Sequence, residues 1–462
     1  MSQSEQSGTL ASYFDLGERD TDVGTELVGG LTTFLTMSYI IVVNPAILSN
    51  AIQIPGYSQA EVIQMIAIAT ALAAFAGTAV MALYARRPFG LAPGMGLNAF
   101  FAYTVVLAMG IPWQTALAAV FVEGVLFIVL TATGARRWVI EMFPEPVKYS
   151  VGAGIGAFLL FLGFQEMHVV ASDEATIVTL GPIAQDPVAM LSLAGLAVTA
   201  MLYARGIRGS IIIGIIATTA VGWALTIAGV VQRGTLAPSS LPAPQYDITP
   251  LFGAFIEGLQ NINPVTFTLV VFTFFFVDFF DTAGTLVGLG HQADLLDEDG
   301  NLPEIDKPLM ADAVATTIGA IVGTSTTTTY IESSTGIEEG SRTGLTALVI
   351  AAGFLLALLA VPLVAAIPLY ASHLALVLVG LIMLQGVTDL DWEDPAWVIA
   401  GGLTILVMPL TASIAWGIAA GLMIYPVVKT AMGEIRDVHP LQWILAGAFV
   451  VYIWVRTSGV LG

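Results

Sequence analysis

Long apolar tracts separated by short polar segments make up most of the chain. Most of these tracts approach the roughly 20 apolar residues that a helix needs to cross a hydrocarbon core about 30 Å thick. The pattern therefore predicts an all-α membrane protein with many transmembrane helices. The tracts cover residues 26–48, 62–84, 113–133, 149–164, 188–203, 210–231, 266–289, 309–322, 343–362, 367–384, 396–408, 412–428 and 441–455.

The composition supports this prediction. Hydrophobic residues make up 56% of the 462 residues and charged residues only 10%, whereas a water-soluble protein of this size needs far more charge to cover its surface. The first 22 residues are polar and acidic, so we expect no signal peptide ahead of the first span. The chain has no cysteine, which excludes disulfides, thiolate metal sites and thiol catalysis.

The polar segments carry a strong excess of acid. The formal net charge is −20, from 34 Asp and Glu against 14 Lys and Arg, and only three of the basic residues are lysine. In a membrane protein this excess must lie in loops such as 294–306 and 389–394. Acidic, lysine-poor loops are typical of adaptation to high salt, and a binding surface for a basic partner is the alternative.

The basic residues predict the orientation. With a cytoplasmic N-terminus, 12 of the 14 basic residues fall on the cytoplasmic side, including Arg136 and Arg137 after the fourth span. Only Arg233 and Arg456 then fall outside. Because cytoplasmic loops are enriched in Lys and Arg, we expect a multi-pass protein of the plasma membrane with its N-terminus in the cytoplasm.

A proline-rich polar stretch at residues 232–264 divides the spans into two sets. Each set contains one place where an expected helix becomes rich in Gly, Pro or Thr: 88–98 (PFGLAPGMGLN) in the first and 323–336 (GTSTTTTYIESSTG) in the second. Each follows the second span of its half and leads into a further span. An odd number of spans per half inverts the second copy, and paired interruptions of this kind indicate a transporter's binding site.

Both interruptions predict short extended segments. Non-helical backbone at membrane depth is tolerated only where protein or trapped water satisfies its hydrogen bonds. The β-branched run Thr326–Tyr330 favours an extended conformation, and the prolines of 88–93 prevent a regular helix. We expect the two segments to pair near the membrane midplane. Each would then start a half-helix, near Met95 and near Ser333, with its free N–H groups facing the protein centre. The alternative is two ordinary loops outside the membrane.

Three acids lie where apolar residues are expected. Asp278 and Asp281 occur in FTFFFVDFFDTAGTL, three residues apart and so on nearly one helical face, and Glu332 opens the second half-helix. Each ionised group at mid-membrane costs roughly 2.5–3.5 kcal/mol. Carboxylates that accept a substrate's N–H groups, or that become neutral on protonation, would explain this cost. The alternatives are interhelical hydrogen bonds for the two aspartates and a helix cap for Glu332.

Other polar residues in the spans give weaker signals. Glu123, within AAVFVEGVLF, is interpreted as a structural partner in the scaffold because no interruption adjoins it. Asn44 and Asn98 are equally suited to bind a ligand or a neighbouring helix. The four histidines are dispersed near span ends, so we expect no metal site. The sequence contains no activated nucleophile, metal cluster or cofactor motif that would indicate an enzyme.

Four separated stretches form a recognisable set. They are YFDLGERDTDVGTELVGGLTTFLTMSYIIVVNPAIL, APGMGLNAFFAY, FVDFFDTAGTL and GTSTTTTYIESSTGIEEGSRTG, in this order. The set resembles the nucleobase–cation symporter family, most strongly its hypoxanthine, guanine and adenine permease branch, and the similarity extends from about Tyr13 to Val455. It implies about 14 transmembrane helices in two inverted seven-helix repeats, in which short antiparallel β segments precede the two half-helices.

The resemblance also implies a division into a core domain and a gate domain. The tract at 441–455 leaves the count of the last spans open. The expected parts are a cytoplasmic tail at 1–22, the core domain at 23–138 and 265–364, the gate domain at 139–231 and 365–462, and an extracellular linker at 232–264.

By motif, the resemblance implies that Asp278 and Glu332 hydrogen-bond the base, with 92–98 and 329–336 forming the pocket. The chain shows no departure from the family at these two acids. Proton coupling is expected at Glu332, Asp278 and Asp281, and Phe276 or Tyr330 could stack on a purine ring. The expected substrate-binding residues are Asp278, Glu332, Asn98, Thr329, Tyr330, Ser333, Phe276 and Met95.

The expected function is secondary active uptake of hypoxanthine, guanine or adenine by proton symport, through rocking of one domain against the other. No cofactor is expected beyond the coupling ion, a proton. The expected partners are a purine nucleobase, the lipid bilayer and, as one option, a second copy of the chain in a homodimer, with no nucleic acid. The alternatives are a uracil or xanthine permease of the same family and a sulfate or bicarbonate carrier of the same fold. The two acids would repel such an anion.

Overall fold

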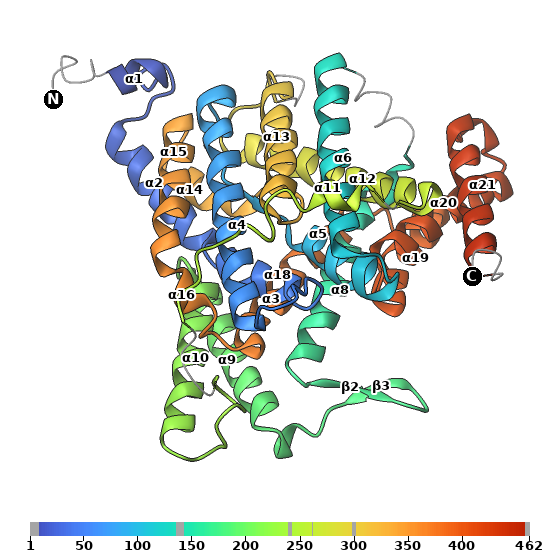
Figure 1. Cartoon of the computed structure of the whole chain (residues 1–462). Coiled ribbons are helices and arrows are strands. Elements are labelled where there is room, and N and C mark those ends of the chain that lie inside the picture. The colour runs from blue at the N-terminus through green and yellow to red at the C-terminus, as the bar shows by residue number, and fades with distance from the viewer. Residues whose placement is uncertain (1–8, 135–142, 239–242, 261, 298–301, 458–462) are drawn as a thin grey trace. The chain divides into compact units, whose positions relative to one another are not determined.

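The structure, a computed structural model, describes residues 9–134, 143–238, 243–260, 262–297 and 302–457. These residues are mostly helical, with short strands paired in two-stranded sheets (Figure 1). Arg136 and Arg137, which contributed to the predicted orientation, lie outside the described residues, as does part of the acidic segment 294–306.

The apolar tracts form helices long enough to span a bilayer. Within the described ranges, ten helical segments have the length and apolar composition of membrane spans, and three shorter apolar helices accompany them. The prediction of a multi-pass helical membrane protein is therefore confirmed, whereas the count of 14 spans and the inverted symmetry stay predictions. The ten segments are Val23–Leu48, Gln59–Ala85, Trp113–Thr133, Glu145–Glu166, Pro187–Ala204, Ser210–Ile227, Pro264–Gln292, Gly344–Val364, Leu369–Asp389 and Ile414–Ala431.

The chain forms two compact units. The larger comprises residues 1–132 and 163–375, and the smaller 133–162 and 376–462. The larger unit contains α1 (Thr9–Tyr13), α2 (Val23–Met37), α3 (Ile40–Leu48), α4 (Gln59–Val80), β1 (Leu91–Pro93), α5 (Met95–Ala99), α6 (Trp113–Thr133), β2 (Val170–Asp173), β3 (Ile177–Leu180), α9 (Pro187–Ala204), α10 (Ser210–Ile227), α11 (Phe255–Gly258), α12 (Pro264–Gln292), α13 (Asp306–Val322), β4 (Thr327–Thr329), α14 (Ser334–Glu338), α15 (Gly344–Ala357), α16 (Val361–Val364) and α17 (Leu369–Ser372).

Small residues bring the helices of the larger unit close together. α4 packs against α13 and α15, and α15 packs against α2. A Cβ atom on Gly77 of α4 would lie 2.5 Å from the Cβ of Ala315 on α13. Two carbon atoms cannot approach so closely, so the packing of these two helices depends on the absence of a side chain at Gly77.

The first span is broken. α2 ends at Met37 and α3 begins at Ile40, with Ser38 and Tyr39 at the break. Pro45 within α3 has no N–H to donate to the carbonyl four residues before it, which weakens the helix just after the break. Tyr39 is only 1% exposed, so the break places an aromatic hydroxyl inside the larger unit.

A buried carboxylate joins the first span to the start of α15. The Glu26 carboxylate accepts hydrogen bonds from the backbone N–H groups of Arg342 (2.8 Å), Thr343 (3.3 Å) and Thr346 (3.2 Å). The hydroxyls of Thr343 and Thr346 also donate to it. These N–H groups have no partner within the helix, so Glu26, which belongs to another span, caps the start of α15. The same hydrogen bonds fix Arg342 and Thr343, which lie in the connection between α14 and α15.

One feature of the larger unit was not predicted. Strands β2 and β3 form an antiparallel hairpin between α8 and α9, with Val170 opposite Leu180 (Figure 1). Its turn is held by Asp173, whose Oδ1 accepts from the N–H groups of Ala175 and Thr176. Strands of four residues are too short to show a clear alternation of apolar and polar positions, and the stretch therefore reads as an ordinary polar connection.

The smaller unit contains most of α8 (Glu145–Glu166), together with α18 (Leu374–Met383), α19 (Pro395–Thr411), α20 (Ile414–Ala431) and α21 (Pro440–Thr457). α8 and α18 are close enough that a Cβ on Gly156 would lie 2.6 Å from the carbonyl oxygen of Gly380. α19 and α20 form an antiparallel pair around the turn at Ala412 and Ser413.

These compact units differ from the predicted core and gate domains. α9 and α10, which fall in the predicted gate segment 139–231, belong to the larger compact unit. Compactness describes packing in one conformation, whereas core and gate are defined by which parts move. The predicted division stays a prediction about motion.

Candidate functional site

The two interrupted segments meet as one small antiparallel sheet. Leu91 of β1 lies opposite Thr329 of β4, and Pro93 lies opposite Thr327. The ends of the pair are closed by hydrogen bonds from the N–H of Gly94 to the carbonyl of Thr326 (3.0 Å) and from that of Tyr330 to Gly90 (2.9 Å). The expected pairing is therefore present, and its depth in a bilayer stays a prediction.

Sequence explains why these strands form and stop. Thr78 of α4 donates its hydroxyl to the carbonyl of Leu91 and accepts the N–H of the same residue, which pins β1 against α4. A Cβ on Gly94 would lie 2.6 Å from the Thr328 methyl group. Only glycine therefore allows the chain to pass so close to β4 before the helix begins.

Both half-helices begin where the sequence predicted. α5 starts at Met95 and continues as a π-helical segment to Ala108, and a 3₁₀ turn at Ile331–Ser333 leads into α14. Asn98 of α5 is fully buried, and its side-chain oxygen accepts a hydrogen bond from the hydroxyl of Ser325. Asn98 thus ties the first half-helix to the residues that precede β4.

Asn44 performs a similar structural task. Its side-chain amide donates to the hydroxyls of Thr70 (2.7 Å) and Thr324 (2.8 Å), so it joins α3, α4 and the end of α13. The sequence left open whether the two asparagines bind a ligand or neighbouring helices. In this structure both contact neighbouring segments.

The acid at the second half-helix is held by a tyrosine from the broken first span. The Tyr39 hydroxyl donates to Glu332 Oε1 at 2.6 Å. Asp281 of α12 interacts electrostatically with Glu332, and both acids also act on the Tyr330 phenol. Glu332 and Asp281 are each half-buried. The structure therefore gathers two partly accessible acids and two tyrosines from three separate parts of the chain.

Asp278 lies deeper than Asp281. It is 0% exposed, and its carboxyl group directly contacts that of Glu123 on α6. One oxygen of Asp278 lies 3.5 Å from the Thr316 hydroxyl, and the other has no hydrogen-bond donor. Although the two aspartates are near one another on α12, only Asp281 acts on Glu332 and Tyr330.

A further buried acid, Asp312 of α13, was not singled out from the sequence. Its carboxylate accepts hydrogen bonds from the hydroxyls of Thr282 (3.0 Å) and Thr329 (3.0 Å), which join it to α12 and β4. The signal that could have identified Asp312 is its place in MADAVATTIGAIV, six residues into α13 among small apolar residues.

The other expected site residues are engaged within the larger unit. Ser333 accepts the N–H of Gly90 (2.9 Å), and the Tyr330 hydroxyl donates to the carbonyl of Pro93. Met95 is 6% exposed and Phe276 is fully buried, next to Phe272 and Phe280. These residues build the walls around the strand pair, and their role toward a ligand stays a prediction.

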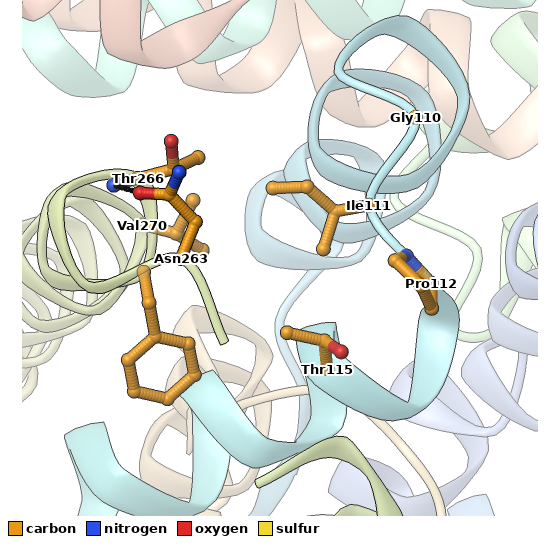
Figure 2. Close-up of a pocket in the computed structure, with 8 residues that line it drawn as sticks. Gly110, Ile111, Pro112, Thr115, Asn263, Thr266 and Val270 are labelled. Atoms are coloured by element: carbon orange, nitrogen blue, oxygen red, sulfur yellow. Dashed lines mark hydrogen bonds between the residues drawn. The ribbon is translucent and has the colours of Figure 1, made fainter. Parts of the chain in front are cut away.

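A cavity of about 150 Å³ lies elsewhere in the larger unit. Figure 2 shows Ile111 and Pro112, ahead of α6, facing Asn263 and Val270 at the start of α12. Asn263 caps α12 by accepting the N–H of Thr266 (3.2 Å). Val270 precedes Asp278 by eight residues, which is about 12 Å along a helix, so this mostly apolar cavity contains none of the acids. Among the described residues, no group of three His, Cys, Asp or Glu side chains is arranged to hold a metal ion.

Comparison with known proteins agrees with the resemblance of the four motifs. Residues 24–420 match the family model of the xanthine and uracil permeases, described as a permease family. A putative permease of Methanocaldococcus jannaschii is 45% identical, with 96% of this chain and 97% of that protein covered. A guanine/hypoxanthine permease of Bacillus subtilis is 40% identical (96% and 100%), and an adenine permease of Escherichia coli is 36% identical (97% and 97%).

Among solved structures, the fold is similar to the transmembrane domain of a cyanobacterial bicarbonate transporter. The TM-score is 0.58 at 16% identity, with 86% of this chain and 97% of that chain covered. At such low identity the likeness concerns the fold alone, because one fold hosts many functions.

Proposed function

Because the chain belongs to the nucleobase–cation symporter family, and is thus a permease rather than an enzyme, we propose that it takes up purine nucleobases together with protons. The proposed substrates are hypoxanthine, guanine and adenine, which are the bases named for relatives that match it over nearly their whole length. The proposed location is the plasma membrane, with the N-terminus in the cytoplasm.

The observation that carries this proposal is the pair of half-buried acids, Asp281 and Glu332, beside Tyr39 and Tyr330. A purine presents a planar ring with adjacent N–H donors and carbonyl or ring-nitrogen acceptors. Carboxylates accept hydrogen bonds from the N–H donors of the base, and an aromatic ring can stack on its planar ring. Within the described residues, no ion pair joins a basic side chain to either acid.

The remaining expected residues take supporting positions in this proposal. Asp281 and Glu332 bind the base. Asp278 is fully buried, so in this proposal it does not contact the base and interacts electrostatically with Asp281. Asn98, Thr329 and Ser333 hold the strand pair in place through their hydrogen bonds. This arrangement keeps the site rigid while the domains around it move.

In the proposed cycle, the strand pair and both half-helices form one rigid core that carries the base across the bilayer midplane. Movement of a core domain against a gate domain, by rocking or as an elevator, would expose the site first outside and then inside. Proton and purine binding together would favour the movement, because each ligand shifts the populations of the two states.

The acids also discriminate against the rival of the same fold. A bicarbonate or sulfate carrier needs a neutral or basic site, whereas Asp281 and Glu332 place negative charge where the anion would bind. A uracil or xanthine permease would use a site of the same chemistry, and transport measurements decide between these bases and the purines.

The proposal is tested by uptake of labelled hypoxanthine, guanine, adenine, xanthine and uracil in cells that lack purine transport, at two external pH values. We expect uptake of hypoxanthine, guanine or adenine that is faster at the lower pH. Glu332→Gln should abolish uptake with normal protein in the membrane, because a neutral amide cannot replace the carboxylate as a double acceptor.

The matched control is Glu338→Gln, an exposed glutamate at the end of the same half-helix, which should transport like the wild type. Preferred uptake of uracil or xanthine would contradict the proposed substrate. Wild-type transport by Glu332→Gln would exclude Glu332 from the mechanism.

A further inference from the structure

Besides Glu26, which caps α15, three acids in the larger unit are fully buried and lie apart from the proposed purine-binding pair. Glu123 is on α6, Asp278 on α12 and Asp312 on α13, and each is 0% exposed. Burying a charge is costly unless it is paired with an opposite charge or well hydrogen-bonded. The contacts of each acid therefore indicate its protonation state.

Asp312 is satisfied as a carboxylate, whereas the other two are not. Each oxygen of Asp312 accepts a threonine hydroxyl at 3.0 Å. Glu123 has two buried oxygens without a hydrogen-bond donor, and Asp278 has one. A buried acceptor without a donor costs about 1–3 kcal/mol, and more when it is charged, so these three oxygens require an explanation.

The charges around the pair make the cost larger. Asp312 acts on both Glu123 and Asp278, and Asp281, one turn along α12, acts on Asp278. The strand β4 contributes threonine hydroxyls only, and Glu257 of α11, which also packs on α6, is exposed at the surface. In the described part of the chain, no Lys, Arg or His forms an ion pair with these acids.

A single proton resolves both problems. Two adjacent carboxyl groups cannot both remain ionised in a dry site without a cation. When one of them is protonated, its O–H donates to the other, and the negative charge of the pair falls from two to one. We propose that Glu123 and Asp278 share one proton, and that this buried pair is the proton-binding site of the transport cycle.

The surrounding contacts hold the pair in place. Gly124, the residue after Glu123, lies so close to α13 that a Cβ there would be 2.6 Å from the Thr317 hydroxyl and 2.9 Å from its backbone nitrogen. α6 is therefore pressed against α13 at the level of Glu123. The hydroxyl of Thr316, on the same turn of α13, donates its hydrogen to the carbonyl of Thr327 (2.9 Å), and its oxygen lies 3.5 Å from Asp278.

The proton site adjoins the strand that leads to the purine site. The buried hydroxyl of Thr326 lies beside the Glu123 carboxyl and interacts with it, although no hydrogen bond of standard geometry joins the two groups in this structure. When the pair loses its proton, the Thr326 hydroxyl is available to donate to the Glu123 carboxylate. Such a change at Thr326 would act on β4, which begins with the next residue. The turn that carries Glu332 begins at Ile331, two residues after the end of β4.

This inference rests on the proposed function for its role in transport, but the protonation itself can be measured without transport. The purified protein in lipid nanodiscs should show the infrared C=O stretch of a protonated carboxylic acid, and Glu123→Gln should remove it. In that variant the amide N–H₂ can donate to Asp278 and leave it ionised. The control Glu338→Gln should keep the band. An unchanged band in Glu123→Gln would overturn the proposal.

The role in coupling is tested by transport with the same variants. Glu123→Gln should still bind and exchange purine, whereas its accumulation of purine should lose the dependence on external pH. Glu123→Asp retains an acid and should restore at least part of that dependence, which also controls for misfolding. Accumulation with the wild-type pH dependence in Glu123→Gln, or accumulation driven by sodium and insensitive to pH, would overturn the proposal. If the wild type carries no purine, the proposed function fails while the infrared result still decides whether the pair holds a proton.

Discussion

Tyr39 and Glu332 come from distant parts of the chain and share a hydrogen bond of 2.6 Å. The tyrosine hydroxyl occupies one carboxylate oxygen and leaves the other for a ligand, so it orients the acid. Tyr39 could not be identified from residue types alone, because its burial depends on the break between α2 and α3. A proline at position 45 indicates a bend, but not which side chain the bend turns inward.

The role of this hydroxyl can be measured with Tyr39→Phe, which keeps the ring. A hydrogen bond to a charged group contributes about 1.5–3 kcal/mol, so we expect the KM for purine uptake to rise about tenfold or more. The matched control is Tyr370→Phe, which removes a buried hydroxyl that donates to the carbonyl of Leu236, and its KM should stay unchanged. An unchanged KM in Tyr39→Phe would show that the hydroxyl does not orient Glu332 for binding.

The four acids recognised from the sequence were separated by the structure into two kinds. Asp278 and Asp281 share a helix face by spacing, yet Asp278 faces Glu123 whereas Asp281 faces Glu332. Spacing gives the angle between two side chains but not which neighbouring helix each one meets. For the same reason Glu123 looked isolated, since its partner lies 155 residues away and only the fold joins them.

At the level of elements, the sequence predicted much of what was observed. The two interruptions, their pairing as strands, and the starts of the half-helices near Met95 and Ser333 all follow from local residue types. The break in the first span, the β2–β3 hairpin and the burial of Asp312 were missed. Each of these depends on long-range packing or on strands too short to leave a pattern.

The cap at the start of α15 gives a prediction at this scale. Glu26→Ala removes the acceptor of three backbone N–H groups, two of which are buried, and each unsatisfied buried group costs about 1–3 kcal/mol. We expect a clear fall in the Tm of the purified protein. The matched variant is Glu61→Ala at the exposed capping box of α4, where water can replace the lost acceptor, so we expect a much smaller fall in Tm. Equal shifts in Tm for the two variants would contradict a special role of the Glu26 cap.

Across the whole molecule, two proposed sites are connected through one small sheet. A partly accessible pair, Asp281 and Glu332, is proposed to bind the base, and a sealed pair, Glu123 and Asp278, is proposed to bind the proton. The strand β4 follows Thr326, which lies beside Glu123, and it precedes the turn that carries Glu332. If each ligand favours the same conformations of this sheet, the two bind cooperatively, because such coupling is reciprocal.

Coupled movement of purine and proton can be measured in liposomes containing only this protein. Labelled hypoxanthine, guanine or adenine is added outside, and its entry is followed together with the internal pH by an enclosed indicator dye. We predict that the interior acidifies as purine enters, and that Glu332→Gln abolishes both signals. Purine entry without acidification, or no purine entry at all, would contradict proton-coupled purine uptake.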